Sequence, residues 1–136
     1  MHSYLKYTAL FYFLNGLAML VLPQFWYLHT PGAAETGPFN AHFVRDIGIA
    51  FVVSGCSLWF SMLQRGLENT ALAWSAMAFL TGHALLHLVE MATMGMTTID
   101  ILRDFALIVL PIVFAVICLM NIGTALTSSR RTPSIN

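Results

Sequence analysis

Charged residues are scarce in this sequence: Asp, Glu, Lys and Arg make up 9% of 136 residues, whereas a soluble globular domain carries roughly 25%. With 58% hydrophobic residues and a mean hydropathy of +0.76, the chain does not fit a water-soluble monomer. Six basic residues balance six acidic ones, and no basic arm is long enough to attract nucleic acid. The scarcity of charge therefore excludes nucleic-acid binding and indicates a protein that lies in a lipid bilayer.

Cysteine is also rare in this chain. Cys56 and Cys118 stand far apart, without the CxxC spacing that is typical of metal or redox pairs. Both fall in apolar segments, where a thiol packs as a small apolar group. The sequence thus favours neither a disulfide nor a cysteine-ligated metal.

Four apolar segments are each long enough for a helix that crosses a bilayer. We expect an all-α, polytopic membrane protein, a four-helix antiparallel bundle that forms one domain over residues 1–136. The expected parts are spans 4–22, 42–63, 70–91 and 100–125, loop 23–41 and tail 126–136. The loop contains three of the five prolines together with Trp26 and Tyr27, aromatic residues that suit a membrane interface.

Basic residues near the span ends set the expected orientation, because Lys and Arg resist translocation. Lys6, Arg65, Arg130 and Arg131 all fall on one side of the predicted bundle. We therefore expect both termini in the cytoplasm of a bacterial inner membrane, with loop 23–41 facing outward.

The second and fourth spans begin with the same polar pattern. Residues 42–46 read HFVRD, and residues 100–104 read DILRD. Both spans would enter the membrane from outside, so the pattern leaves open a parallel duplication of a two-helix unit. It predicts two Arg-Asp pairs at matching depths.

Ionisable side chains gather in the outward half of the predicted bundle, although they cost several kcal/mol in a bilayer and are seldom there without a partner or a function. His83, His87 and Glu90 share one helix face, because residues three or four apart lie above one another. Two more polar faces pair His42 with Asp46, and Asp100 with Asp104. Since polar faces avoid lipid, we expect all three to turn inward around one outward-facing pocket.

Imidazoles at i and i+4 with a carboxylate three residues later have the spacing with which one helix presents several ligands to a metal ion. We predict a transition-metal site for copper, zinc or iron. The predicted ligands are His42, Asp46, His83, His87, Glu90 and Asp104. Met91, Met94 and Met96 follow directly and would add thioether ligands that suit Cu(I), with interfacial packing as their alternative role.

The Arg-Asp pairs also have a structural interpretation, because buried ion pairs can fix the register of helices. We expect Arg45, Asp46, Arg103 and Asp104 to form structural ion pairs. The natural partners lie across the bundle, Arg45 with Asp104 and Arg103 with Asp46.

Other functions stay open at this point. A haem held by two histidines would place His42 opposite His83 or His87, although a porphyrin needs an apolar slot that carboxylates would crowd. A quinone or lipid head group could enter sideways and bind to a histidine and the arginines. No nucleophile stands at a defined spacing from a base, so the sequence does not decide whether the protein is an enzyme.

The protein could instead be a non-catalytic accessory or assembly subunit that docks on a larger membrane complex or forms a homo-oligomer. Small residues on the second span, Gly48, Ser54, Gly55 and Ser57, permit the close approach of another helix. The polar layer would then serve only to fix the helices.

Size, span count and the segment VRDIGIAFVVSG, residues 44–55, resemble the small four-helix bacterial inner-membrane proteins of the DoxX-like kind. Those proteins have short connections and an arginine near the start of a glycine-containing helix. The resemblance implies a four-helix membrane fold and transfers no catalytic residue. Some members of such families act as partners of larger membrane enzymes, which supports the accessory-subunit hypothesis.

Overall fold

The computed structural model describes residues 2–63 and 67–129, with side chains for residues 3–63 and 70–121. In chain order the elements are α1 (His2–Val21), α2 (Pro23–His29), the 3-10 helix η1 (Ala33–Glu35), α3 (Ala41–Ser61), α4 (Leu67–Thr93), α5 (Thr98–Asp104), the π-helix η2 (Phe105–Val109) and α6 (Leu110–Ser129). No strand occurs in the described ranges, and the all-α prediction is confirmed.

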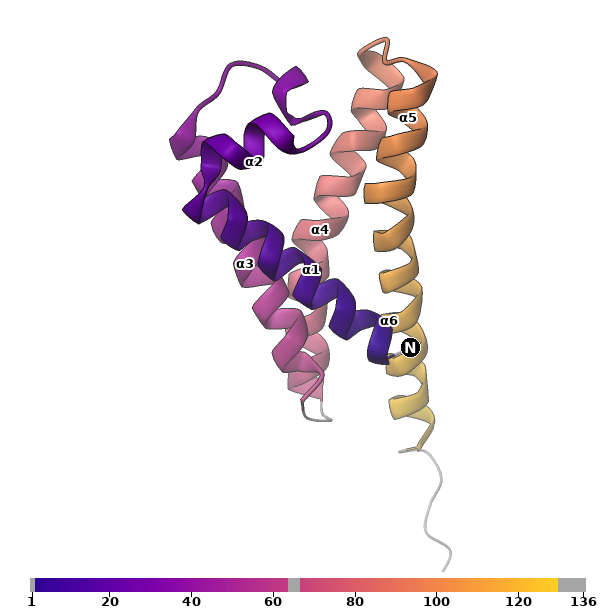
Figure 1. Ribbon diagram of the computed structural model, residues 1–136. Coiled ribbons are helices and arrows are strands. Elements are labelled where there is room, and N and C mark those ends of the chain that lie inside the picture. The colour runs from indigo at the N-terminus through magenta and orange to yellow at the C-terminus, as the bar shows by residue number, and fades with distance from the viewer. Residues whose placement is uncertain (1, 64–66, 130–136) are drawn as a thin grey trace, which may run out of the picture.

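Four stretches of helix are long and apolar enough to cross a membrane: Ser3–Val21, Ala41–Ser61, Thr70–Thr93 and Thr98–Asn121. The last one runs through α5, η2 and α6 as a single rod (Figure 1). Many large apolar side chains stay exposed on these helices, for example Phe11, Val53 and Leu107, as expected for surfaces that face lipid. The prediction of four membrane-spanning helices is confirmed, although α6 continues to Ser129, beyond the predicted end at residue 125. Arg65, Arg130 and Arg131 lie outside the described residues.

The first and third helices cross at very short distance along a stripe of small residues. A Cβ atom on Gly16 would lie 2.5 Å from the carbonyl oxygen of Gly48, and one on Gly55 would lie 2.7 Å from that of Ala9. Backbones can approach this closely only where side chains are absent. Gly48 and Gly55, which the sequence suggested as a surface for a partner, are therefore used within the chain.

The other two long helices form a second pair, and α4 packs against both α3 and α6. Buried residues on α4, such as Met77 and Leu80, join the same core as Ile112 and Leu119 of α6. The N-terminal part of α1 crosses toward α6 (Figure 1), where the Tyr4 hydroxyl donates a hydrogen bond of 2.8 Å to the Pro111 carbonyl. These contacts close the four spans into one bundle.

Segment 23–41, which the sequence predicted as a loop, contains a short helix and is folded onto the bundle. Pro23 starts α2, where its missing N–H costs nothing. The indole Nε1 of Trp26 donates to the Asn15 side chain at 2.9 Å, and the Tyr27 hydroxyl donates to the Gly37 carbonyl. The segment lies at the end of the molecule where α3 begins and α4 ends (Figure 1).

Candidate functional site

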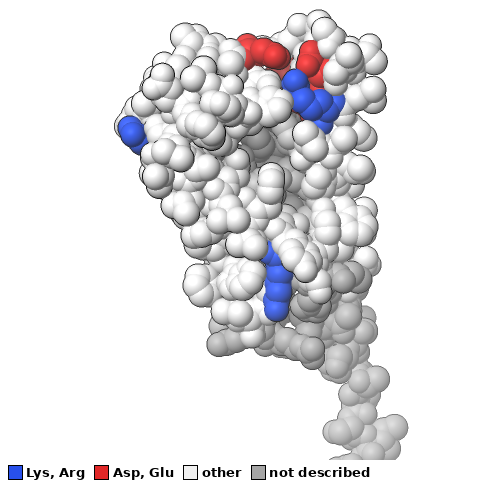
Figure 2. All heavy atoms as spheres, viewed as in Figure 1, with Lys and Arg blue, Asp and Glu red and all other residues white. Residues whose placement is uncertain are grey.

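Charged side chains gather at one end of the molecule. Figure 2 shows acidic and basic side chains side by side at the end that carries the start of α5, while most of the remaining face has neither. The charged and imidazole groups of α4 and α5 that interact there are His87, Glu90, Asp100, Arg103 and Asp104.

Arg103 holds two carboxylates of its own helix in fixed positions. Its Nη1 lies 2.8 Å from Oδ1 of Asp100, and its Nε lies 2.8 Å from Oδ1 of Asp104. Asp100 also forms two hydrogen bonds with the N-cap residue Thr97. The backbone N–H of Asp100 donates to the Thr97 hydroxyl, and that hydroxyl donates to the Asp100 carboxylate. Because charge-assisted hydrogen bonds are strong and directional, Arg103 fixes the position of the Asp104 carboxylate and leaves its second oxygen, Oδ2, to a partner on another helix.

That second oxygen joins α5 to α4. Oδ2 of Asp104 lies 3.2 Å from Nδ1 of His87, and Oε2 of Glu90 lies 3.6 Å from the same nitrogen. The Asp104 side chain is 9% exposed and that of His87 is 17% exposed. An ionised carboxylate can only accept a hydrogen bond, so Nδ1 donates and a neutral His87 keeps Nε2 as an acceptor.

His83 lies one helical turn from His87 and has a different environment. The two imidazoles meet edge to face, with centroids 4.8 Å apart. The rings of Phe51, at 5.2 Å, and Phe79, at 6.3 Å, lie against His83 from α3 and α4. No described residue forms a hydrogen bond with the His83 ring, which is only half-buried. Its nitrogens are therefore available to a partner from outside the described chain.

The six predicted metal ligands do not all meet. His42 and Asp46 pair with each other at 3.3 Å, and their side chains are 90% and 53% exposed. Asp46 lies about half a turn around α3 from Gly48. Because the Gly48 face is buried against α1, the face with His42 and Asp46 points away from α1, to the outside of the bundle. Within the described part of the chain, no three His, Cys, Asp or Glu side chains are arranged to hold a metal ion.

The expected ion pairs across the bundle are wrong. Arg103 pairs with Asp100 and Asp104 of its own helix, whereas Nε of Arg45 donates to the Leu20 carbonyl at 3.3 Å. The reason is that α4 packs against both α3 and the rod that begins with α5. The helices α3 and α5 begin at the same end of the molecule (Figure 1), but Arg45 and Arg103 near their starts have different partners.

The three methionines lie past the imidazole stripe. Met91 is half-buried near the end of α4, and Met96 is half-buried in the turn before α5. Met94 is 70% exposed. Their role as thioether ligands stays a prediction.

Sequence reasoning missed two contributions to this end of the molecule. Phe79 stands four residues before His83, a spacing that signals a shared helix face, but Phe51 comes from another helix and left no local signal.

The segment after α2 also reaches the cluster: a Cβ atom on Gly32 would lie 2.8 Å from Nη2 of Arg103, and Glu35 is near enough to act electrostatically on Arg103.

Comparisons with protein-family models, curated proteins and solved structures find no match for this chain.

Proposed function

We propose that this membrane protein binds the hydrogen-bonding head of an organic ligand dissolved in the membrane, at the imidazole pair His83 and His87. The single observation that carries the proposal is the His83 ring, which has no hydrogen-bond partner among the described residues and lies beside an imidazole that Asp104 orients. To hold α4 against α5, the contact of His87 with Asp104, whose other oxygen accepts from Arg103, is sufficient. His83 lies beyond this contact, so its polar nitrogens indicate a partner from outside the chain.

The chemistry of the pair favours a hydroxyl-bearing ring. A carboxylate that accepts from Nδ1 leaves Nε2 of His87 to accept a hydroxyl proton, which is the arrangement of an oriented base. Phe51 and Phe79 surround His83 with aromatic faces, against which a flat ring packs well. A quinol combines the hydroxyl with the flat ring, and a lipid head with a hydroxyl group provides the hydroxyl alone. Both imidazoles keep part of their surface exposed, so a ligand can approach them from the side.

We expect the imidazole pair to face the outward side of a bacterial inner membrane, with both termini in the cytoplasm. The placement of Lys6 in α1 supports this orientation, because its end of the helix lies away from the charged cluster (Figure 1) and basic residues favour the cytoplasmic side. Arg45 and Arg103 lie at the cluster's end, where each donates to an oxygen of the protein.

A transition metal is the second candidate ligand. A metal-bound histidine commonly donates its other ring N–H to a carboxylate, as His87 does to Asp104. The donors would then be His83, His87 and Glu90, without His42 and Asp46. An organic ligand is preferred because no three such side chains of the described residues are arranged around one point where a metal ion could sit. The pairing of His42 with a second histidine around haem loses its support, since His42 is turned to the outside.

Extraction of the purified protein tests the proposal. The protein is purified in mild detergent without a metal-binding tag, and its organic extract and metal content are measured for the wild type, His83→Phe and the control His42→Phe. We expect one organic molecule that is retained by the wild type and the control and is lost from His83→Phe. Equal content in all three proteins would overturn the proposal. A near-stoichiometric metal would support the second candidate, and a stoichiometric larger protein would support an accessory subunit.

A further inference from the structure

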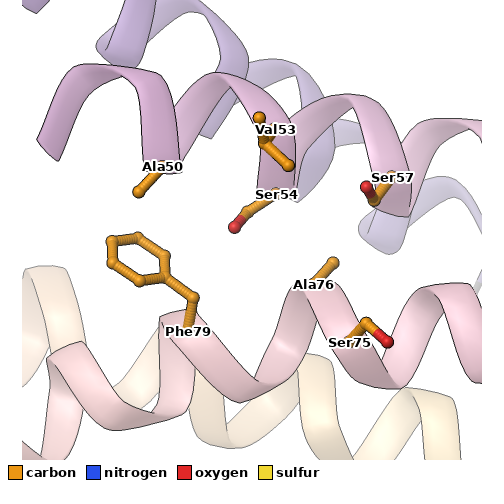
Figure 3. A pocket seen from close by; sticks show the side chains of 7 residues that line it. All are labelled: Ala50, Val53, Ser54, Ser57, Ser75, Ala76 and Phe79. Carbon is orange, nitrogen blue, oxygen red and sulfur yellow. The ribbon is translucent and has the colours of Figure 1, made fainter. Parts of the chain in front are cut away.

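A groove of about 220 Å³ opens between α3 and α4 on the side of the molecule that faces lipid. Figure 3 shows side chains from both helices around it, with Ser54 and Ser57 on α3 facing Ser75, Ala76 and Phe79 on α4. The groove contains no residue of the imidazole pair or of the charged cluster, but it shares Phe79 with the surroundings of His83.

Ser54 is the unusual residue of this groove. Only 4% of the residue's surface is exposed, and no described residue forms a hydrogen bond with its hydroxyl. Figure 3 shows the hydroxyl pointing into the groove. By contrast, Ser61 and Ser75 donate to carbonyls of their own helices at 2.7 and 3.0 Å. The Ser54 oxygen is open to the groove rather than enclosed, because no enclosed side-chain oxygen or nitrogen of the described residues lacks a partner. In a bilayer, a hydroxyl that meets hydrocarbon without a partner is costly, so Ser54 indicates an acceptor that occupies the groove.

The groove changes character with depth in the membrane. Ser57 and Ser54 precede the end of α3 at Ser61 by roughly 6 and 10 Å, at about 1.5 Å per residue. Ala50 and Phe79 line the part nearer the middle of their helices. Hydroxyl groups therefore lie toward the membrane surface and apolar groups toward the bilayer centre. An ester-linked lipid has the same order, with carbonyl oxygens near the surface and acyl chains below them.

We propose that this groove holds a membrane phospholipid whose ester carbonyl accepts hydrogen bonds from Ser54 and Ser57. One acyl chain runs past Ala50 to the ring of Phe79. A hydrocarbon chain alone would leave the Ser54 hydroxyl unpaired, and water alone would not suit the apolar wall around Ala50 and Phe79. The two proposed sites share the ring of Phe79, but they rest on different polar groups: the hydroxyls of Ser54 and Ser57 here, and the imidazoles of His83 and His87 there.

Native mass spectrometry in detergent tests this proposal with two matched lipids. The probes are a dioleoyl phosphatidylglycerol and its diether analogue, which has the same head and chains but no ester carbonyl. Ser54→Ala is compared with Ser61→Ala, because Ser61 is also a buried serine of α3 but donates to its own helix. We expect the ester lipid to bind the wild type and Ser61→Ala equally, and to bind Ser54→Ala about three- to tenfold more weakly, the worth of one hydrogen bond.

The diether lipid should bind all three proteins no more tightly than the ester lipid binds Ser54→Ala, because it lacks the acceptor of both Ser54 and Ser57. Equal binding of both lipids to the wild type would overturn the proposal, as would an unchanged affinity of Ser54→Ala. A stable dimer that dissociates in Ser54→Ala, without bound lipid, would also overturn it and assign the groove to a second copy of the chain. None of these results bears on the organic ligand retained through His83.

Discussion

Nδ1 of His87 lies 3.2 Å from Oδ2 of Asp104, and this contact joins the end of α4 to the start of the last span. Arg103 holds the other carboxylate oxygen at 2.8 Å, so one aspartate is shared between a guanidinium and an imidazole. The contact fixes the orientation of His87 while its neighbour His83 keeps no polar partner in the described chain. The proposed function rests on this difference between two adjacent imidazoles.

Asp104→Asn should destabilise the folded protein by about 1 to 3 kcal/mol, the typical cost of leaving a buried polar group without its partner. The amide has one acceptor oxygen for two donors, Nε of Arg103 and Nδ1 of His87, and Asp100 then remains as the carboxylate beside Arg103. Thermal unfolding in detergent, read by circular dichroism, measures the change. Asp46→Asn is the matched control: its side chain is 53% exposed, so we expect a change within about 0.5 kcal/mol. Equal effects of the two substitutions would contradict the buried pair.

Gly16→Ala should destabilise the contact between α1 and α3 by about 1 to 3 kcal/mol, because the new methyl group overlaps the backbone of Gly48. The control is Gly82→Ala in α4, where a Cβ atom meets nothing within 4 Å. Alanine has the higher helix propensity, so this control should leave stability unchanged or raise it by up to about 1 kcal/mol. The same unfolding measurement compares them, and a loss in Gly82→Ala as large as that in Gly16→Ala would contradict the close crossing.

Gly32→Ala should loosen Arg103 and the start of α5. Gly32 has a φ of +84°, and the new methyl group would also come within 2.8 Å of the Arg103 guanidinium. Gly95→Ala separates the two effects, because Gly95 has a φ of +64° with no atom within 4 Å of its Cβ position. We expect faster amide hydrogen exchange in residues 98–104 for Gly32→Ala than for Gly95→Ala. Equal exchange would mean that the segment after α2 does not support Arg103.

The four spans were predictable because each is a long apolar run, and hydrogen-bonded helix is the conformation that satisfies such a backbone in lipid. The stripe of His83, His87 and Glu90 followed from helical spacing within one segment. The proximity of His87 to Asp104 followed from similar depth on neighbouring helices that a short turn connects.

The rotation of α3 about its axis was not predictable in the same way. The assumption that every polar face turns inward failed for His42 and Asp46, because the glycine face of α3 packs against Gly16 and Ala9 of α1. Which face of α3 is buried depends on how closely its backbone can approach that of α1, and this distance is set by the residues of both helices together. The helix in segment 23–41 was missed for a related reason: the hydrogen bond between Trp26 and Asn15 that docks it joins two different elements.

The most direct test of the central claim is the ¹⁵N NMR spectrum of the protein labelled at histidine. The spectrum is recorded first after lipids have been stripped away, and then after addition of the membrane lipid extract of the cells that produce the protein. We expect the ring nitrogens of His83 and Nε2 of His87 to shift when the ligand returns, while the exposed His42 stays unchanged. Unchanged His83 and His87 signals, or a shift of His42 alone, would contradict a ligand at the imidazole pair.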